Sequence, residues 1–249
     1  MNKKILFWDI EVFPAVYYGW SKFNPPFSQI EKTSINTICY KWAHEKKVET
    51  IQLTKKQHAK DPRNELPLIK QMLKVINEAD IVIAHNGDRF DWKKFNARVL
   101  KYGLKPARKP KLIDTLKMVK REAAFDSHRL GDLCTELGIK TKVETEKNLF
   151  IKALHSWKHY EALADYCRHD VLALEALYDR LRPHCKPTVN AAGLANKLKA
   201  CASCGSDHLI KYGTYILNNG TEVQRYRCGD CGSTKTRDSA NGSKTLTAI

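Results

Sequence analysis

The chain has 249 residues, 43% of them hydrophobic, which is enough for one domain with a full core and a small additional module. It has no apolar run of the roughly 18 residues that a transmembrane helix needs, and Asp9 and Glu11 interrupt the N-terminal stretch where a secretory signal would stay apolar. We therefore expect an intracellular protein, cytoplasmic or in the host cytoplasm if viral. The formal charge of +16 predicts nucleic acid, not a membrane, as the polyanionic partner, with a merely solubilising surface as the alternative.

The predicted elements form an α/β domain in which most strands come early and most helices late. Strand patterns cover residues 4–11, 15–20, 35–43, 48–53 and 81–84. Helical patterns cover residues 66–76 and 92–102, with Gly103 as a C-cap, and later segments after Thr115, after Ser127 and over 160–181. Asp114 and Ser127 are expected to cap helices.

Two carboxylates occupy an unusual place on the first strand. Side chains alternate along a strand, so Asp9 and Glu11 share a face with Ile5 and Phe7. Buried like charges repel each other and lose hydration, so they need a cation to stay ionised. The alternative is a strand end that dips into solvent, with Glu11 simply exposed.

Two more carboxylates come from the helical part of the chain. Asp170 fills a slot between Cys167 and Leu174 in an apolar stripe where the pattern asks for leucine, and Tyr166 lies one turn earlier. Asp91 follows the Asn86-Gly87 turn as a helix begins. The alternatives are that Asp170 pairs with a Lys or Arg at the edge and that Asp91 caps its helix.

Carboxylate oxygens suit Mg²⁺ or Mn²⁺. Two such ions, roughly 4 Å apart, can activate a water and stabilise the leaving oxygen when a phosphodiester bond is cut. The combination of buried acids and a basic chain therefore indicates hydrolysis of a nucleic-acid backbone.

At this point the sequence resembles the DnaQ-like, or DEDD, exonuclease superfamily, which has a ribonuclease-H-like mixed sheet flanked by helices. The resemblance covers roughly residues 4–181 and rests on three motifs in the family's order: Phe7-Trp8-Asp9-Ile10-Glu11, Ile83-Ala84-His85-Asn86-Gly87-Asp88-Arg89-Phe90-Asp91 and Tyr166-Cys167-Arg168-His169-Asp170. The last motif matches the tyrosine subtype, because Asp165, not His, precedes Tyr166 and His169 is out of register for the histidine form.

The resemblance implies a role for each matched residue. Asp9, Glu11 and Asp170 would hold the metal that activates water, and Asp9 and Asp91 would hold a second one. Tyr166 would orient the water. The implied activity is 3'–5' removal of nucleoside 5'-monophosphates, from DNA in preference to RNA and from single-stranded 3' ends. A non-catalytic nucleic-acid-binding protein and a structure-specific endonuclease remain alternatives.

Aromatic and amide residues near these motifs are candidate substrate contacts. Asn86 and Phe90 are expected to shape the pocket for the terminal nucleotide. Trp8, Phe13 and Tyr17 are candidates for stacking on bases, although each is expected in the core more often than in a contact.

Two Cys-x-x-Cys pairs near the end predict a zinc ribbon. Cys201 and Cys204 are separated from Cys228 and Cys231 by a hairpin with an Asn-Gly turn, a pattern typical of a four-thiolate structural Zn²⁺ site. Basic residues and tyrosines on this module indicate that it binds nucleic acid, with docking to a protein as the alternative. We expect four segments: an exonuclease domain (1–183), a linker (184–199), the zinc ribbon (200–237) and a flexible tail (238–249).

Overall fold

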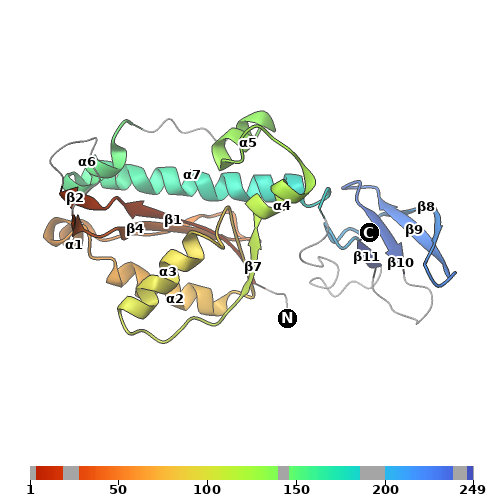
Figure 1. Cartoon of the computed structure of the whole chain (residues 1–249), viewed down its shortest axis with the longest axis horizontal. Coiled ribbons are helices and arrows are strands. Elements are labelled where there is room, and N and C mark those ends of the chain that lie inside the picture. Colours follow the sequence, from red (N-terminus) through yellow and green to blue (C-terminus); the bar gives the residue numbers. More distant parts are fainter. Residues whose placement is uncertain (1–3, 19–27, 140–145, 186–199, 238–245, 249) are drawn as a thin grey trace. The chain divides into compact units, whose positions relative to one another are not determined.

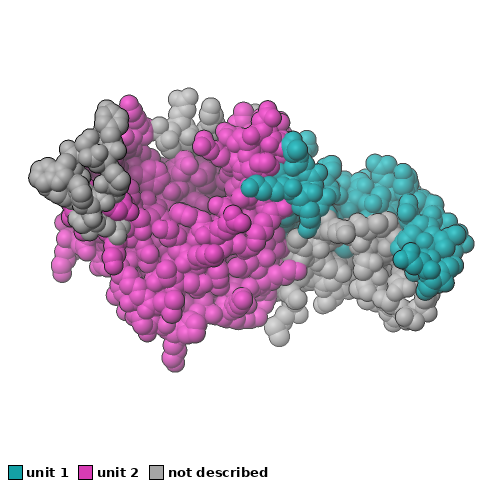
Figure 2. Space-filling model, viewed as in Figure 1, with its two compact units in different colours: residues 1–3, 118–124, 177–249 teal, residues 4–117, 125–176 magenta. Residues whose placement is uncertain are grey.

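The computed structural model describes residues 4–18, 28–139, 146–185, 200–237 and 246–248. It contains two compact units, coloured separately in Figure 2. The larger unit is Lys4–Lys117 with Phe125–Ala176, and the smaller one is Met1–Lys3, Met118–Ala124 and Leu177–Ile249. The linker predicted at 184–199 lies, except for its first two residues, outside the described residues, and the four-segment division stays a prediction. Within the described part of the chain, no helix is long and apolar enough to cross a membrane.

The larger unit is built on a five-stranded mixed sheet with the order β5-β4-β1-β6-β7. β1 runs antiparallel to β4 and parallel to β6, and β6 runs parallel to β7. The bounds of the five strands are β1 Ile5–Phe13, β4 Ser34–Trp42, β5 Glu49–Ile51, β6 Ile81–Ala84 and β7 Lys111–Asp114. The predicted mixed sheet is confirmed, and four of its strands lie within three residues of their expected ends.

Helices cover both faces of this sheet, as Figure 1 shows. On one face are α2 (Leu66–Glu78) and α3 (Asp91–Lys101), and Trp8 of β1 meets Phe95 of α3 edge to face with ring centroids 5.8 Å apart. On the other face is α7 (Trp157–Leu181), whose Tyr160 hydroxyl donates to the backbone carbonyl of Asn36 at 2.6 Å. Alternation along β1 therefore sends even-numbered side chains toward α3 and odd-numbered ones toward α7.

The remaining elements of the larger unit are short, and several were not predicted. They are β2 Val16–Tyr18, β3 Ser28–Glu31, α1 Lys55–Lys60, α5 Leu130–Glu136 and α6 Leu149–His155, and α4 Thr115–Glu122 is divided between the units. β2 falls inside the expected strand at 15–20, of which Trp20 lies outside the described residues.

The two expected caps differ from each other. Asp114 does cap α4, because its carboxylate accepts from the backbone N–H of Leu116 at 3.0 Å. Ser127 does not cap α5, whose N-cap is Arg129. Its hydroxyl lies two residues earlier, where it accepts from the backbone N–H of Arg129 at 3.3 Å and donates to Asp132 at 2.6 Å. Ser127 therefore stabilises the turn before α5, and its prediction as a helix cap is wrong.

The C-terminal part of the smaller unit is a four-stranded sheet with the order β11-β10-β9-β8. Its strands are β8 Leu209–Ile216, β9 Glu222–Cys228, β10 Thr234–Arg237 and β11 Leu246–Ala248. The predicted hairpin is confirmed, with Gly220 at φ +80° in its turn. The tail expected to be flexible contains β11, which uses the outer edge of β10 as a pairing partner. Residues 238–245 and 249 lie outside the described residues.

A buried carboxylate fixes the strand β4 that supports the end of β1. Glu65 is fully buried and accepts hydrogen bonds from the backbone of Ile35 at 2.7 Å, from Arg98 Nε at 2.9 Å and from Lys101 Nζ at 2.9 Å. Burial acts to raise the pKa of Glu65, but these donors outweigh it and the pKa lies below its usual value. One side chain thus ties β4 to α2 and α3.

We predict that Glu65→Gln lowers the free energy of unfolding by about 3 kcal/mol, because it leaves Arg98 buried without a counter-charge. Chemical denaturation at neutral pH measures this loss. The folded pKa is lowered from 4.5, so the loss should shrink as pH falls below that value. Glu78→Gln, at an exposed pair with Lys4, is the control and should change stability by less than about 1 kcal/mol. Equal losses of unfolding free energy in the two variants would contradict the stabilising role of the buried Glu65.

Candidate active site

Asp9 and Glu11 lie on β1 beyond the point where β6 stops pairing with it. The parallel register ends at Phe7, which is opposite Ile83, while the antiparallel pairing with β4 continues. Both carboxylates are on the odd-numbered face that α7 covers, and both are half-buried. The alternative of a strand end dipping into solvent, with Glu11 simply exposed, therefore does not describe β1.

Asp91 fills the place that β6 leaves open beside β1. Its Oδ1 accepts a hydrogen bond from the backbone N–H of Ile10 at 3.2 Å, and the side chain is only 2% exposed. The N-cap of α3 is Phe90, which makes no side-chain cap hydrogen bond. Asp91 therefore does not cap α3. Its side chain instead makes a tertiary contact that holds the start of α3 against β1.

The turn between β6 and α3 is shaped for this approach. Asn86 adopts φ +61°, and its backbone N–H donates to Asp114 Oδ1 at 2.9 Å. A Cβ on Gly87 would lie 2.3 Å from the Cβ of Ala84, so only glycine fits there. The ring of His85 fixes the turn from behind, with its nitrogens 2.9 Å from Thr115 Oγ1 and 2.8 Å from the carbonyl oxygen of His128. The position of Asp91 thus follows from the turn before it.

Asp170 and Tyr166 come from the middle of α7. The apolar stripe around them is buried as the sequence pattern predicts, with Cys167 and Leu174 at most 1% exposed. Asp170 is half-buried, and the hydroxyl of Tyr166 donates a hydrogen bond to it. Burial, and next the charge of Asp170, raise the pKa of Tyr166, so its phenol stays protonated at neutral pH.

The four carboxylates are close enough to alter one another's ionisation. Burial, followed by the charges of Glu11, Asp91 and Asp170, raises the pKa of Asp9 well above its usual value. Burial, followed by Asp170 and Asp91, does the same for Glu11. Burial raises the pKa of Asp91 to about 7 and that of Asp170 to about 6, against the opposing effect of their hydrogen bonds.

The described residues offer these acids no ion pair that would relieve the repulsion. Among the described residues, no Lys or Arg forms an ion pair with any of the four acids, so the alternative that Asp170 pairs with such a side chain is not observed there. A cluster of buried oxygen donors without a counter-charge is the ligand set that hard divalent cations prefer. Asp9, Glu11, Asp91 and Asp170 therefore fit a site for Mg²⁺ or Mn²⁺.

Sequence reasoning missed one group in this cluster. Cys167 was assigned only to the apolar stripe, but its Sγ lies 3.6 Å from Asp9 Oδ2, and the donor atoms of Asp9, Glu11 and Cys167 lie within 4.8 Å of one another. Burial raises the pKa of this thiol, so it is present in its neutral form beside the acids. The signal was available, since Cys167 lies three residues before Asp170 in the same stripe.

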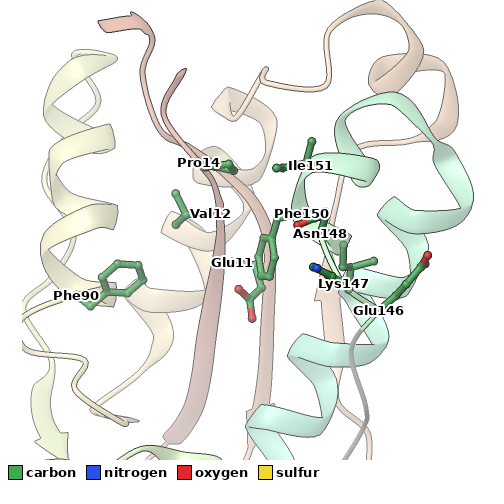
Figure 3. A pocket seen from close by; sticks show the side chains of 10 residues that line it. Glu11, Val12, Pro14, Phe90, Glu146, Lys147, Asn148, Phe150 and Ile151 are labelled. Carbon is green, nitrogen blue, oxygen red and sulfur yellow. The ribbon is translucent and has the colours of Figure 1, made fainter. Parts of the chain in front are cut away.

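A cavity of about 630 Å³, shown in Figure 3, adjoins Glu11 but none of the other three acids. Glu11 and the half-exposed ring of Phe90 line it, and the expected contact of Phe90 with a terminal nucleotide stays a prediction. Lys147, two residues before α6, and Phe150, in its first turn, line it too and were not predicted. The ring of Phe150 also packs at 79° against that of Tyr166, with centroids 6.4 Å apart. Asn86 does not line this cavity.

The proposed base-stacking aromatics divide by burial. Trp8 is 1% exposed and Phe13 is fully buried, so both belong to the core and neither can stack on a base. Because side chains alternate along β1, Trp8 lies on the opposite face of the sheet from Asp9 and Glu11. Tyr17, by contrast, is 53% exposed.

The four C-terminal cysteines come together as predicted. Sγ atoms of Cys201 and Cys231, and of Cys204 and Cys228, are 3.6 Å apart, and all four lie within 4.8 Å of one another with no disulfide. A tetrahedral zinc with Zn–S bonds of about 2.3 Å would separate its sulfurs by about 3.8 Å. The cluster therefore fits Zn²⁺ with no position left for a substrate.

The two knuckles repeat one local structure. Each has the sequence Cys-x-x-Cys-Gly-Ser, with the glycine at positive φ (+78° at Gly205 and +74° at Gly232). In each, the first cysteine accepts from the glycine N–H and donates its own N–H to the serine carbonyl, at 2.6–2.9 Å. This six-residue repeat was readable in the sequence and was overlooked there.

Comparisons with known proteins agree with this fold. The family model for the RNase_H superfamily matches residues 27–182, a range that contains Asp91, Tyr166 and Asp170 but begins after Asp9 and Glu11. A curated relative, "DNA polymerase III PolC-type" of Ureaplasma parvum serovar 3, is 45% identical over 62 residues, which are 25% of this chain and 4% of that protein.

A solved structure shares the fold. It is the family B DNA polymerase of the hyperthermophilic archaeon Pyrobaculum calidifontis, with a TM-score of 0.54 and 13% identity. The match covers 73% of this chain and 25% of the polymerase. The matched segments are thus a small part of both polymerases.

The raised pKa of Asp91 predicts how stability depends on pH in the metal-free protein. The folded pKa of about 7 lies above the ordinary 3.8, so the folded state holds the proton more tightly across that range. Stability should therefore fall as pH rises from about 4 to 7. Asp91→Asn keeps the oxygen that accepts from Ile10 but has no proton to lose, so its melting temperature should exceed that of the wild type by roughly 5 °C above pH 7.

Thermal melts across this pH range test the prediction. The exposed Asp126→Asn is the matched control and should follow the wild type at every pH. Added Mg²⁺ should raise the melting temperature of the wild type at high pH more than that of Asp91→Asn. If the melting temperature depended on pH in the same way in wild type and Asp91→Asn, the claim that Asp91 carries a buried, uncompensated charge would be wrong.

Proposed function

The chain belongs to the RNase_H superfamily, and from this we propose that it is a metal-dependent nuclease that removes nucleoside 5'-monophosphates from the 3' end of a nucleic acid. The observation that carries the proposal is that Asp9 and Glu11 of β1 lie close to Asp91 and Asp170, which come from two distant parts of the sequence, and that no Lys or Arg among the described residues forms an ion pair with them. The basic charge of +16 supports a polyanionic substrate.

The acids divide into two ligand sets in this proposal. Asp9, Glu11 and Asp170 hold one Mg²⁺ or Mn²⁺, and Asp9 and Asp91 hold a second. When bound, the two ions supply an activated water and stabilise the leaving oxygen during in-line displacement. The hydrogen bond from the backbone N–H of Ile10 to Asp91 Oδ1 holds that carboxylate beside β1, close to Asp9.

Tyr166 orients the attacking water. Because its raised pKa keeps the phenol neutral, it is a hydrogen-bond donor and acceptor throughout the neutral range. Its hydrogen bond to Asp170 directs the hydroxyl to the metal-binding carboxylate, and Phe150 packs against the ring and limits its rotation. Tyrosine thus fills the role that a histidine would have in the sister subtype.

The terminal nucleotide enters the cavity beside Glu11. The exposed ring of Phe90 offers a surface on which a base can stack, and Lys147 offers a positive charge to a phosphate. A single strand suits this cavity because a stacked base must be free of its partner strand. Likeness to two DNA polymerases favours DNA over RNA.

Activity on matched oligonucleotides labelled at the 5' end tests this function. With Mg²⁺ or Mn²⁺, we expect a ladder of products shortened from the 3' end. Asp170→Asn should lower kcat by about 100-fold or more, because the metal ligand contributes several kcal/mol to the transition state. Asp165→Asn is the matched control, an exposed acid on the same helix, and should keep near-normal activity.

A substrate with a blocked 3' end distinguishes the alternatives. Continued cutting of a blocked strand would assign an endonuclease. Binding of the unblocked strand without any cutting would assign a non-catalytic binding protein. Either result would contradict the exonuclease proposal, and so would wild-type activity in Asp170→Asn.

The cysteine cluster holds one structural Zn²⁺ in this proposal. Protein purified without chelators should contain one zinc per chain, and Cys204→Ser should lose it, because three thiolates bind the ion far more weakly than four. Cys185→Ser removes a buried thiol outside the cluster and should retain the zinc. Metal analysis measures both, and equal zinc contents in the two variants would contradict the site.

A further inference from the structure

Strand β8 is the edge strand of the C-terminal sheet, and it contains a bulge that reorients its side chains. Lys211 pairs with Tyr226 and Thr214 with Gln224, so two residues of β8, Tyr212 and Gly213, lie opposite a single residue of β9. Gly213 has φ +78°, which a bulge of this kind requires. Because strand side chains alternate, the extra residue allows Tyr212 and Tyr215 to share one face although they are three apart.

The bulge brings tyrosines and arginines together on that face. We call it the Tyr–Arg face and define it by five residues: Ile210, Tyr212, Tyr215, Arg225 and Arg227. The guanidinium of Arg225 lies 4.8 Å from the ring centroid of Tyr215, and that of Arg227 lies 6.0 Å from the ring of Tyr212. Tyr212 is 54% exposed, so stacking on its arginine still leaves much of the ring open.

Charge on this face is positive only. The sole acidic residue of β8 and β9 is Glu222, which pairs with Ile216 and so points to the opposite face from Tyr215. Asp230, in the knuckle, is occupied by hydrogen bonds with Ser206 at 2.5 Å and His208 at 3.0 Å. A guanidinium stacked on a ring keeps its N–H edge directed outward, a geometry suited to phosphate oxygens.

One donor on this face lacks an acceptor. Nε of Arg225 is buried and has no hydrogen-bond partner among the described residues. A buried N–H without an acceptor destabilises the fold, and an oxygen from a ligand bound between the stacked groups would satisfy it. The unsatisfied N–H belongs to the guanidinium that stacks on Tyr215, and it adds a hydrogen-bonding reason for an anionic ligand to the stacking one.

We propose that the Tyr–Arg face is a second nucleic-acid site, which binds a single strand by stacking bases on the tyrosines and pairing phosphates with the arginines. Single strands suit it because the bases of a duplex are already stacked on one another. The site requires no catalytic acid, so it does not depend on whether the larger unit cuts its substrate.

Binding of a circular oligothymidine to the zinc-loaded full chain tests the proposal. A circle has no 3' end, so an exonuclease site has no terminus to hold, and no Mg²⁺ or Mn²⁺ is added. We expect Tyr212→Leu to weaken binding at least 5-fold by removing a stacking surface. Arg227→Gln should weaken binding and reduce the slope of log K against log salt by about 0.7.

Lys211→Gln is the matched control, because it removes the same charge from the same hairpin but on the other face, opposite Tyr226. Its affinity should stay within about 2-fold of the wild type. Arg227→Lys keeps the charge and should still weaken binding, because an ammonium does not stack as a guanidinium does. Zinc content of each variant verifies that the cluster is intact.

The proposal fails if the circle does not bind to the wild type, or if Arg227→Gln and Lys211→Gln weaken binding equally. The first outcome would leave the face as a protein-docking surface, and the second would leave only diffuse attraction between charges. Hydrolysis of the p-nitrophenyl ester of thymidine 5'-monophosphate reports on the nuclease proposal separately, since that ester offers no strand to the Tyr–Arg face.

Discussion

Four carboxylates that converge in a partly desolvated place, with no ion pair to a Lys or Arg among the described residues, are the constraint on which this structure depends. Burial raises the pKa of all four acids, and the charges of neighbouring acids raise it further for Asp9 and Glu11. In the absence of metal, the protonated form of the site is therefore favoured. Such a site is costly for a fold that does not use it. Divalent cations offset the cost, and the same ions supply the chemistry of phosphodiester cleavage.

The sheet creates that convergence by ending its strands at different points. β6 stops pairing with β1 at Phe7, which exposes the backbone of Ile10 to the side chain of Asp91. Antiparallel β4 continues beside β1 and holds Asp9 and Glu11 in an extended conformation. Helix α7 then closes the odd-numbered face and adds Asp170. The acids are thus positioned by strand ends and a helix face, and the large cavity beside Glu11 is left for substrate.

Much of this arrangement could be predicted from the sequence, because the acids break strong patterns. Asp170 interrupts an apolar stripe and Asp9 alternates with core residues, and the structure brings the two side chains close together, while their role as metal ligands stays a proposal. Short elements without such patterns were missed, among them β7 and α6, and with α6 the cavity residues Lys147 and Phe150. The bulge at Gly213 could not be foreseen either, because strand register depends on the partner strand as well as on local sequence. Trp8 and Phe13 were expected in the core more often than against a base, and the structure buries both: Trp8 packs on Phe95 of α3, and Phe13 packs on Tyr160 of α7.

Anomalous diffraction from crystals soaked in Mn²⁺ tests the central claim most directly. The account predicts two manganese peaks about 4 Å apart, one bound by Asp9, Glu11 and Asp170 and the other shared between Asp9 and Asp91. Peaks only at other places on the chain, with the four carboxylates protonated and free of metal at neutral pH, would contradict it.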